Sequence, residues 1–314
     1  MIYNQQRKCT ELKERLIGII DIGSNSVRLV IYQIDNTSNY TELKNEKVSA
    51  RLINYIQEDG KLKEEGVQIL LSTLDQFNQI LSSYPEIEVM GFATAVIRQA
   101  SNKEAILNAM KLHIDCPFRL LSEYEEAYYG YVSVINAIDI DNGFTIDIGG
   151  GSTEITLFKD QKLIEYVSFP FGAVSLDRRF PGEQELTVAH LEKIHSFLIE
   201  AFKQHPWLTN QNVPIIGIGG TARNVGRVHQ ATKKIQQPVM SYADVHRVLM
   251  DIASVPFDDR GKIKGLSKKR KDIIIPGIMI ILTLMEEIQA PCFIPIDQSI
   301  REGVLCDLFL KEQQ

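Results

Sequence analysis

One pattern occurs twice in this chain, and it constrains the fold more than any other feature. D-I-G-S-N-S-V-R-L-V-I-Y begins at Asp21, and D-I-G-G-G-S-T-E-I-T-L-F begins at Asp147. In each copy the D-I-G turn leads into an apolar run, which is typical of two strands joined by a tight bend. Two copies this far apart indicate duplicated domains, because the repeats of a solenoid follow one another every ~20 to 50 residues.

The repeat predicts two duplicated domains, each with its own acidic hairpin, and two domains supply a cleft between them. The expected domains are 1–124 and 125–314, and the last helix, at about 298–314, is able to pack back on the first domain. A third glycine turn, G-I-G-G-T from Gly217 to Thr221, follows an apolar run and opens a predicted helix. No flexible linker separates the halves, so the predicted boundary is soft.

Local patterns place several helices. Apolar residues recur at helical spacing from Val67 to Leu81, which predicts a helix that packs on one face. Ser101 with Glu104, and Ser122 with Glu125, match the capping box, in which each side chain bonds the backbone N–H of the other residue. We therefore expect helices to begin at both serines, and the second of these helices connects the two halves.

The glycine turns suit phosphate binding. Glycine lets a ligand approach the main chain closely, so that successive N–H groups converge on phosphate oxygens. Small hydroxyl groups add donors without bulk at Ser24, Ser26, Ser152 and Thr221. Each turn alone is more typical of a plain hairpin, and none is a Walker loop, because G-x-x-x-x-G-K-[ST] does not occur in the chain. The recurrence of the same chemistry in three turns favours phosphate sites.

Three carboxylates flank the two repeated turns, namely Asp21, Asp147 and Glu154. Oxygen ligands of this kind suit Mg²⁺ (or Mn²⁺), which keeps several waters and is shared with substrate phosphate. We predict that the three acids face one site and hold a divalent metal there. The alternative for Glu154 is an outward-facing strand residue.

Two adjacent acids, Glu125 and Glu126, fall in the first turn of the connecting helix, where the helix dipole alone favours carboxylates. Glu125 is assigned to the capping box with Ser122, whereas Glu126 has no local partner. We therefore predict that Glu126 is the general base that activates a water for attack on a terminal phosphoryl group. The alternative is a solvated acid that only complements the dipole.

Basic residues supply two further candidates. Arg98 lies just past a predicted strand, where its guanidinium can clamp a phosphate with two parallel hydrogen bonds. An ordinary surface arginine is the alternative. The basic run from Lys262 to Lys271 reads either as a track for a long anion or, more commonly, as a solvated charged face.

Composition and missing motifs exclude several classes. A net charge of -6 argues against nucleic acid or membrane as a partner, because such binders carry a basic surface. H-E-x-x-H, C-x-x-C and G-x-S-x-G are all absent, so zinc, disulfide and acyl-transfer chemistry are not indicated. The longest apolar stretch, Ile273 to Met285, contains Pro276 and Gly277 and is too short for a bilayer, so we expect a soluble cytoplasmic protein.

Together these motifs resemble the exopolyphosphatase and guanosine pentaphosphate phosphatase (Ppx/GppA) family of the actin, Hsp70 and sugar-kinase superfold. The matching segments, in the family's order, are I-D-I-G-S-N-S at Ile20, A-T-A-V-I-R-Q-A-S-N at Ala93, E-E-A at Glu125, D-I-G-G-G-S-T-E at Asp147, G-A-V-S-L at Gly172, G-I-G-G-T-A-R-N at Gly217 and R-E-G at Arg301. The resemblance implies an α/β protein of two ribonuclease-H-like domains of actin-like ATPase fold, each with a mixed sheet flanked by helices. It also implies a Mg²⁺ ion in the cleft between them and hydrolysis of a terminal phosphoanhydride.

The resemblance also assigns roles to residues. It implies that Glu126 is the base and that Asp147 and Glu154 position metal and water. Asp21 is assigned to both metal binding and phosphate binding. Phosphate binding is implied for Ser24, Asn25, Ser26, Arg98, Gly149, Gly150, Gly151, Ser152, Gly219, Gly220 and Thr221.

Two departures from the family pattern bear on the substrate. Glu123 stands where members often carry a glycine in S-G-x-E-E-A, which adds charge and bulk near the entrance. Longer members append a helical domain related to HD phosphohydrolases, and we expect a short form without it that has a weaker grip on long polyphosphate.

The sequence thus predicts an enzyme that releases terminal orthophosphate from inorganic polyphosphate, from guanosine pentaphosphate, or from both. It leaves open which substrate is preferred and which chain length of polyphosphate is preferred. It also leaves open whether guanosine tetraphosphate is a ligand and whether the protein forms a homodimer. The alternatives are a phosphotransferase of the same superfold that uses ATP or ADP, and a non-catalytic alarmone-binding module.

Overall fold

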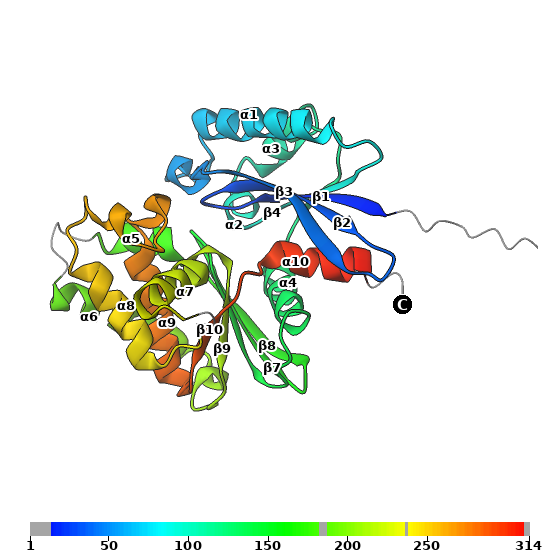
Figure 1. Cartoon of the computed structure of the whole chain (residues 1–314). Coiled ribbons are helices and arrows are strands. Elements are labelled where there is room, and N and C mark those ends of the chain that lie inside the picture. Colours follow the sequence, from blue (N-terminus) through cyan, green and yellow to red (C-terminus); the bar gives the residue numbers. More distant parts are fainter. Residues whose placement is uncertain (1–13, 182–186, 236–237, 311–314) are drawn as a thin grey trace, which may run out of the picture.

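A computed structural model describes residues 14–181, 187–235 and 238–310, which form two lobes, each built around a five-stranded sheet (Figure 1). The outer ends of the two predicted domains, 1–13 and 311–314, lie outside the described residues. Helix α4 (Glu123–Ile135) lies between the two sheets and contains residue 125, where the sequence divides the chain. The division itself remains a proposal.

The first sheet has the strand order β3-β2-β1-β4-β5. Its first three strands form an antiparallel meander, and β4 and β5 run parallel to β1. The strands are β1 (Arg15–Ile22), β2 (Val27–Ile34), β3 (Tyr40–Val48), β4 (Glu88–Ala93) and β5 (Phe118–Leu120).

The second sheet repeats this arrangement, with the order β10-β9-β6-β7-β8. Strands β6, β7 and β8 form the meander, and β9 and β10 run parallel to β6. The strands are β6 (Gly143–Ile148), β7 (Thr153–Lys159), β8 (Lys162–Phe169), β9 (Ile215–Ile218) and β10 (Phe293–Pro295). The same order and directions in both sheets confirm the predicted pair of ribonuclease-H-like domains of actin-like fold.

Helices cover both faces of each sheet. Helices α1 and α3 pack on the outer face of the first sheet, α5 to α9 pack on the outer face of the second, and α4 and α10 lie between the sheets (Figure 1). The other helices are α1 (Glu64–Leu81), α2 (Ala95–Arg98), α3 (Lys103–Met110), α5 (Ala173–Arg179), α6 (Val188–Phe202), α7 (Gly219–Lys233), α8 (Tyr242–Ala253), α9 (Ile274–Ile288) and α10 (Ile300–Leu305). Short 3₁₀ turns at Leu52–Tyr55 (η1) and Lys268–Arg270 (η4) matter for the site.

Strand alternation decides which acids face this middle layer. In β1, Ile19 packs in the same cluster as α10, so Asp21, two residues further on, lies on that face. In β7, Ile155 fills the core on the opposite side from α4, so Glu154 faces α4, as its cross-strand partner Asp147 does. The acids of both lobes therefore point toward the layer that carries Glu126.

The two predicted capping boxes have different outcomes. At α4 the prediction is confirmed, because the Ser122 hydroxyl accepts from Glu125 N at 3.2 Å and Ser122 N donates to Glu125 Oε2 at 2.8 Å. At α3 it is wrong, because the N-cap is Asn102 and no side-chain cap bond forms. The Asn102 amide instead bonds both the N–H and the carbonyl of Leu62, at 3.0 Å each, so a tertiary contact has replaced the local one.

Replacing Ser122 by alanine is expected to lower the free energy of unfolding by about 1 kcal/mol, because one N–H at the start of α4 loses its acceptor. The measurement is the midpoint of urea unfolding relative to wild type. Ser101→Ala is the matched control, with an expected change below about 0.5 kcal/mol. Equal losses in the two variants would contradict the structural assignment of the caps.

The most apolar helix is α9, and it is a core element of the second lobe. Every residue from Ile274 to Met285 is buried, and Pro276 sits in its first turn, where a missing N–H costs little. Within the described residues, no helix combines the length and hydropathy needed to span a bilayer.

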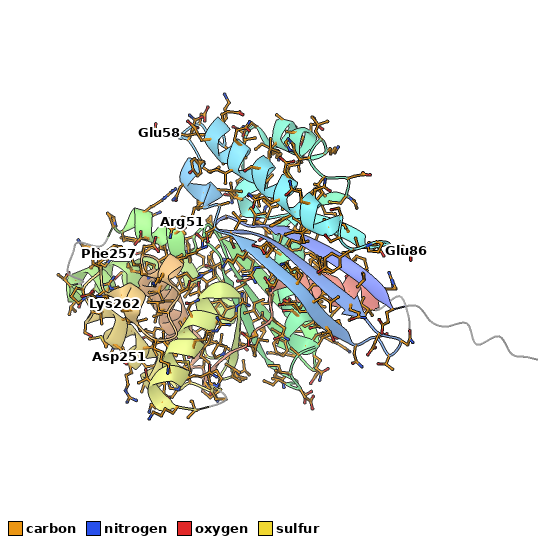
Figure 2. All side chains as sticks on the ribbon, turned by 45° about the horizontal axis from the view of Figure 1, so that its top comes forward. Arg51, Glu58, Glu86, Asp251, Phe257 and Lys262 are labelled. Atoms are coloured by element: carbon orange, nitrogen blue, oxygen red, sulfur yellow. The ribbon has the colours of Figure 1, made fainter. Side chains whose placement is uncertain are left out.

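The lobes also touch on one side through η1. The Arg51 side chain donates to Asp272 Oδ2 at 2.9 Å and to the Lys269 carbonyl at 3.0 Å. From the other lobe, the Arg178 side chain donates to the Ile53 carbonyl at 3.1 Å. Arg51 accordingly lies where the upper lobe meets the lower one in Figure 2.

Candidate active site

Residues from both lobes line one cleft beside α4 and α10. Most of the predicted site residues are among them: Asp21, Ser24, Asn25, Ser26, Glu126, Asp147, Gly149, Gly150, Ser152, Glu154, Gly219 and Gly220. Arg98, Gly151 and Thr221 are not among the residues that line it. The structure therefore brings the three glycine turns and the predicted base together, while their chemical roles remain predictions.

Two of the acids that line the cleft, Glu126 and Glu154, form a buried pair. Glu126 and Glu154 are only 3% and 4% exposed, so neither is the solvated or outward-facing residue that the sequence leaves open. The Glu154 carboxylate accepts a hydrogen bond from the Ser168 hydroxyl at 2.8 Å. Such deep burial of two acids is costly for a structural role alone and is typical of functional sites.

Burial and mutual repulsion set the protonation of these acids. Burial, and then the charge of Glu154, raises the pKa of Glu126 well above its usual range, against the lowering influence of Arg98. Burial and the neighbouring Asp147 raise the pKa of Glu154 to about 7. Burial likewise raises the pKa of Asp147 to about 6, although Arg223 acts in the opposite direction. These three carboxylates therefore tend to take up protons, or to bind a cation that offsets their charge.

Arg98 is placed against the predicted base. Its Nη1 forms an ion pair with Glu126 Oε1 and donates to the Leu121 carbonyl at 2.8 Å. Its Nη2 is buried, makes no hydrogen bond to the described residues, and lies 4.0 Å from Glu123 Oε1. One half of the guanidinium thus orients Glu126, and the other half has donor capacity left.

Close packing around the turns explains their glycines. Gly219 has a φ of +76°, and a Cβ there would lie 2.3 Å from Asp147 Oδ1, so only glycine fits beneath this carboxylate. A Cβ on Gly172 would lie 2.5 Å from the Gly149 carbonyl oxygen. The carboxylate of one turn and the backbone of another are thereby held within the same site.

The predicted three-carboxylate metal set does not assemble as one cage. Among the described residues, no group of three or more histidine, cysteine, aspartate or glutamate side chains is arranged to hold a metal ion. Asp21 is engaged by Arg301, whose Nη1 donates to its Oδ2 at 2.5 Å. Asp147 and Glu154, paired across β6 and β7, remain. Two carboxylates fit Mg²⁺ well, because this ion keeps waters and takes its other ligands from substrate phosphate.

A basic group in the cleft was predicted at one member only, Arg270 of the basic run from Lys262 to Lys271. Its members are Arg28, Lys47, Arg223, Arg270 and Arg301, all of which line the cleft. Two of them lie in motifs that the sequence shows, Arg223 in T-A-R-N and Arg301 in R-E-G. Lys47 carries no motif signal, because only strand pairing brings it to the cleft, whereas Arg28 lies within the repeated segment that begins at Asp21. The basic run from Lys262 to Lys271 contributes one residue, Arg270, whereas Lys268 and Lys269 are exposed.

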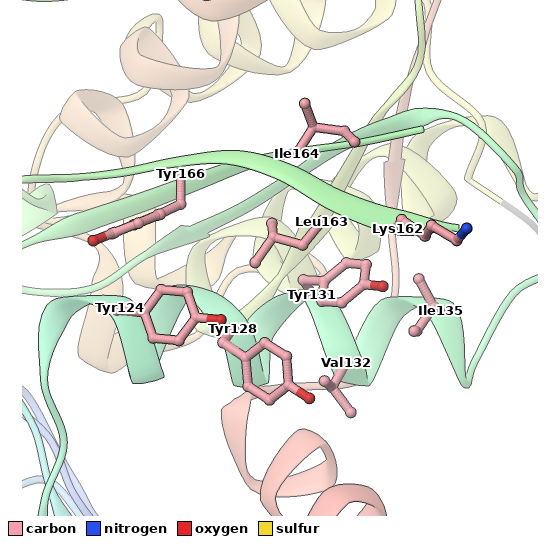
Figure 3. A pocket seen from close by; sticks show the side chains of 9 residues that line it. All are labelled: Tyr124, Tyr128, Tyr131, Val132, Ile135, Lys162, Leu163, Ile164 and Tyr166. Atoms are coloured by element: carbon pink, nitrogen blue, oxygen red, sulfur yellow. The ribbon is translucent and has the colours of Figure 1, made fainter. Parts of the chain in front are cut away.

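A second hollow lies between α4 and β8 (Figure 3). Its lining is aromatic and aliphatic, with one lysine and no carboxylate: Tyr124, Tyr128, Tyr131, Val132, Ile135, Lys162, Leu163, Ile164 and Tyr166. It is larger than the cleft, but a hollow without acids or converging backbone turns lacks the groups for phosphoryl chemistry.

Comparisons with known proteins agree with the fold and with the motifs. The sequence model of the Ppx/GppA phosphatase family matches residues 30–312. The chain is 29% identical over 293 residues to a bifunctional 3-dehydroquinate synthase/phosphatase of Fusobacterium nucleatum, which covers 85% of this chain and 42% of that protein. It is 24% identical over 299 residues to exopolyphosphatase 1 of Mycobacterium tuberculosis, with 92% and 87% covered.

A solved structure gives the same result in three dimensions. The crystal structure of the Aquifex aeolicus member of the Ppx/GppA family superimposes with a TM-score of 0.82 at 26% identity, and the match covers 96% of this chain and 100% of that one. The predicted resemblance is therefore confirmed. Since the family model spans most of the sequence and a family structure covers nearly the whole fold, this chain belongs to the Ppx/GppA phosphatase family.

Proposed function

We propose that the chain hydrolyses the terminal phosphoanhydride bond of inorganic polyphosphate and releases orthophosphate. One observation carries this proposal: backbone turns from both lobes, a buried acidic pair and a basic group line the same cleft. Such an arrangement can bracket a chain of phosphoryl groups and present its end to an activated water. The exopolyphosphatase name of the mycobacterial relative supports this substrate class.

In this proposal Glu126 accepts a proton from the attacking water, and Arg98 orients it through their ion pair. The Nη2 of Arg98 has donor capacity left, but it is buried and Arg98 does not line the cleft, so the phosphate clamp remains a prediction of the sequence. N–H groups of the glycine turns donate to the phosphate oxygens. Phosphoryl transfer needs little covalent help, so positioning and charge stabilisation supply most of the rate.

A divalent cation belongs to the same proposal. Asp147 and Glu154 would hold Mg²⁺ or Mn²⁺, which supplies a positive charge that offsets the phosphate oxygens. Asp21 is held by Arg301 and contributes to the phosphate side of the cleft. Hydrolysis of guanosine pentaphosphate, a homodimer and a cytoplasmic location remain predictions of the sequence.

The test is release of orthophosphate from tripolyphosphate, from long polyphosphate and from guanosine pentaphosphate, each with Mg²⁺, with Mn²⁺ and with a chelator. We expect release from polyphosphate that requires a divalent cation. ADP is added in a parallel assay, where formation of ATP in place of free phosphate would identify a phosphotransferase. Absence of phosphate release from every polyphosphate under all metal conditions would reject the proposed function.

A further inference from the structure

The glycine turns of the two lobes lie against each other. A Cβ on Gly150 would lie 3.2 Å from the Ser24 Cβ, and a Cβ on Gly151 would lie 3.1 Å from the Ile53 Cδ1 methyl. Gly150 belongs to the β6–β7 bend of the second lobe, whereas Ser24 belongs to the β1–β2 bend of the first. The distance between the two turns therefore depends on how the lobes are held together.

Backbone hydrogen bonds join the turn of the first lobe to η1. The Arg51 N–H donates to the Asn25 carbonyl at 3.1 Å, and the Ile53 N–H donates to the Ser24 carbonyl at 3.0 Å. Arg51 has a φ of +46°, in the left-handed region that is uncommon for any residue but glycine, so the surrounding contacts fix its backbone. A displacement of η1 therefore carries the first turn with it.

Helix α5 holds the turn of the second lobe in the same way. The Ala173 N–H donates to the Gly149 carbonyl at 2.9 Å, and the Val174 N–H donates to the Gly150 carbonyl at 3.0 Å. Both donors belong to the G-A-V-S-L segment, and they lie in the first turn of the helix, where N–H groups lack partners within the helix. A displacement of α5 therefore carries the second turn with it.

Two arginines, one from each lobe, connect η1 to the second lobe. Arg178 of α5 donates through Nη1 to the Ile53 carbonyl at 3.1 Å. In the opposite direction, Arg51 donates to Asp272 Oδ2 at 2.9 Å. Each guanidinium makes a second hydrogen bond across the lobes, an arrangement that fixes orientation as well as distance. Neither arginine lines the cleft.

These two arginines lie far from the place where the chain passes between the lobes. That place is the layer of α4 and α10, and α5 lies at the left of Figure 1, well away from both. A rotation of one lobe about this layer would separate η1 from α5, and with them the two glycine turns. Hydrogen bonds between η1 and the second lobe oppose such a rotation.

We propose that Arg51 and Arg178 are positioning residues that hold the lobes closed and thereby set the distance between the turn at 24–26 and the turn at 149–152. They act through the backbone that carries the turns. A protein whose lobes are closed for only a fraction of the time binds its substrate more weakly by that fraction. The proposal rests on the proposed function for its kinetic readout, whereas the separation of the lobes is measured on the free protein.

The first test is the radius of gyration of the free protein, measured by small-angle X-ray scattering. Arg51→Gln/Arg178→Gln removes one interlobe arginine from each lobe, and its radius of gyration is expected to exceed that of wild type because the lobes separate. Arg51→Lys/Arg178→Lys is expected to lie between the two, since each ammonium still donates to one of the two acceptors.

Arg15→Gln/Arg179→Gln is the matched control, because it removes the same charge from each lobe. The Arg15 side chain pairs with Glu88 within the first lobe, and the Arg179 guanidinium lies 4.3 Å from the Phe197 ring centroid within the second. The control is expected to keep the wild-type radius of gyration. Equal radii in the two glutamine variants would overturn the proposal.

The second test separates KM from kcat for tripolyphosphate. Arg51→Gln/Arg178→Gln is expected to raise KM about tenfold, because charge-assisted hydrogen bonds that favour the closed lobes are lost. Its kcat should stay within about twofold of wild type, since bound substrate closes the lobes around unchanged catalytic groups. A lower kcat with an unchanged KM would contradict the proposal. If wild type releases no phosphate from any polyphosphate, the proposed function fails, and the scattering comparison still decides the role of the arginines.

A protein that keeps both arginines covers the case in which the double variant does not fold. Hydrogen exchange is measured in Glu126→Gln, which is expected to bind tripolyphosphate with little turnover. Tripolyphosphate should slow exchange at the N–H groups of Arg51 and Ile53, which lie outside the cleft, because closed lobes hold η1 more firmly. The N–H groups of α3, in the same lobe, should exchange as before. Unchanged exchange at Arg51 and Ile53 under saturating tripolyphosphate would count against the two arginines as positioning residues.

Discussion

Glu126→Gln is expected to lower the rate of phosphate release by about 10²- to 10⁴-fold, because glutamine cannot accept a proton from the attacking water. Glutamine keeps a carbonyl oxygen at the position that bonds Arg98, so the buried guanidinium retains an acceptor. The variant should therefore unfold close to the wild-type urea midpoint, and its KM should change little. The measurements are steady-state phosphate release from polyphosphate and urea unfolding.

The adjacent acid supplies the matched control. Glu125 lies one residue earlier on the same helical turn, but its carboxylate bonds Ser122 N at 2.8 Å and Arg119 Nη2 at 2.6 Å. Glu125→Gln is expected to keep the wild-type kcat and to lose at most about 1 kcal/mol of stability. Near-normal turnover by Glu126→Gln, or an equal loss in both variants, would remove Glu126 from the role of base.

Gly303→Ala is expected to cost at least about 3 kcal/mol of stability, beyond what overpacking of flexible side chains usually costs. A Cβ on Gly303 would lie 1.9 Å from the Tyr129 carbonyl oxygen, so the backbones of α10 and α4 must separate. The gain in helix propensity, about 1 kcal/mol, is too small to offset this clash. Because α10 carries Arg301 and α4 carries Glu126, phosphate release should fall as well.

Gly130 provides the control for this substitution. It lies on α4 next to Tyr129, and a Cβ there would meet the Ile218 Cδ1 methyl at 3.3 Å, the far end of a flexible side chain. Gly130→Ala is expected to be neutral or stabilising by up to about 1 kcal/mol. Urea unfolding and phosphate release are compared in the two alanine variants. A Gly303→Ala protein as stable and as active as Gly130→Ala would show that the helix crossing tolerates separation.

Periodicity and turn chemistry predicted several elements that position the site. The helical stripe from Val67 to Leu81 is α1, and the box at Ser122 starts α4 as expected. The repeated D-I-G turns are the bends of β1–β2 and β6–β7. These features depend on local backbone preferences and on neighbours a few residues apart, which a single sequence contains.

Long-range pairing decided the rest. Arg98 was expected at a phosphate, and the structure puts it on Glu126, because the end of α2 and the start of α4 meet only after β4 and β5 pair. Glu154 faces α4 rather than solvent because its sheet is buried on both faces. A strand buried on both faces lacks the alternation of polar and apolar residues, so its sequence does not show which side chains face which way.

The sequence by itself therefore determined the two related domains, their glycine turns and the acids beside them, because each is a local pattern with a local cause. Only the tertiary structure brought Lys47 beside Arg28 and Arg301 onto Asp21. Those contacts join residues that are far apart in the chain. Their electrostatic energy depends on burial and distance, two quantities that the order of amino acids does not contain.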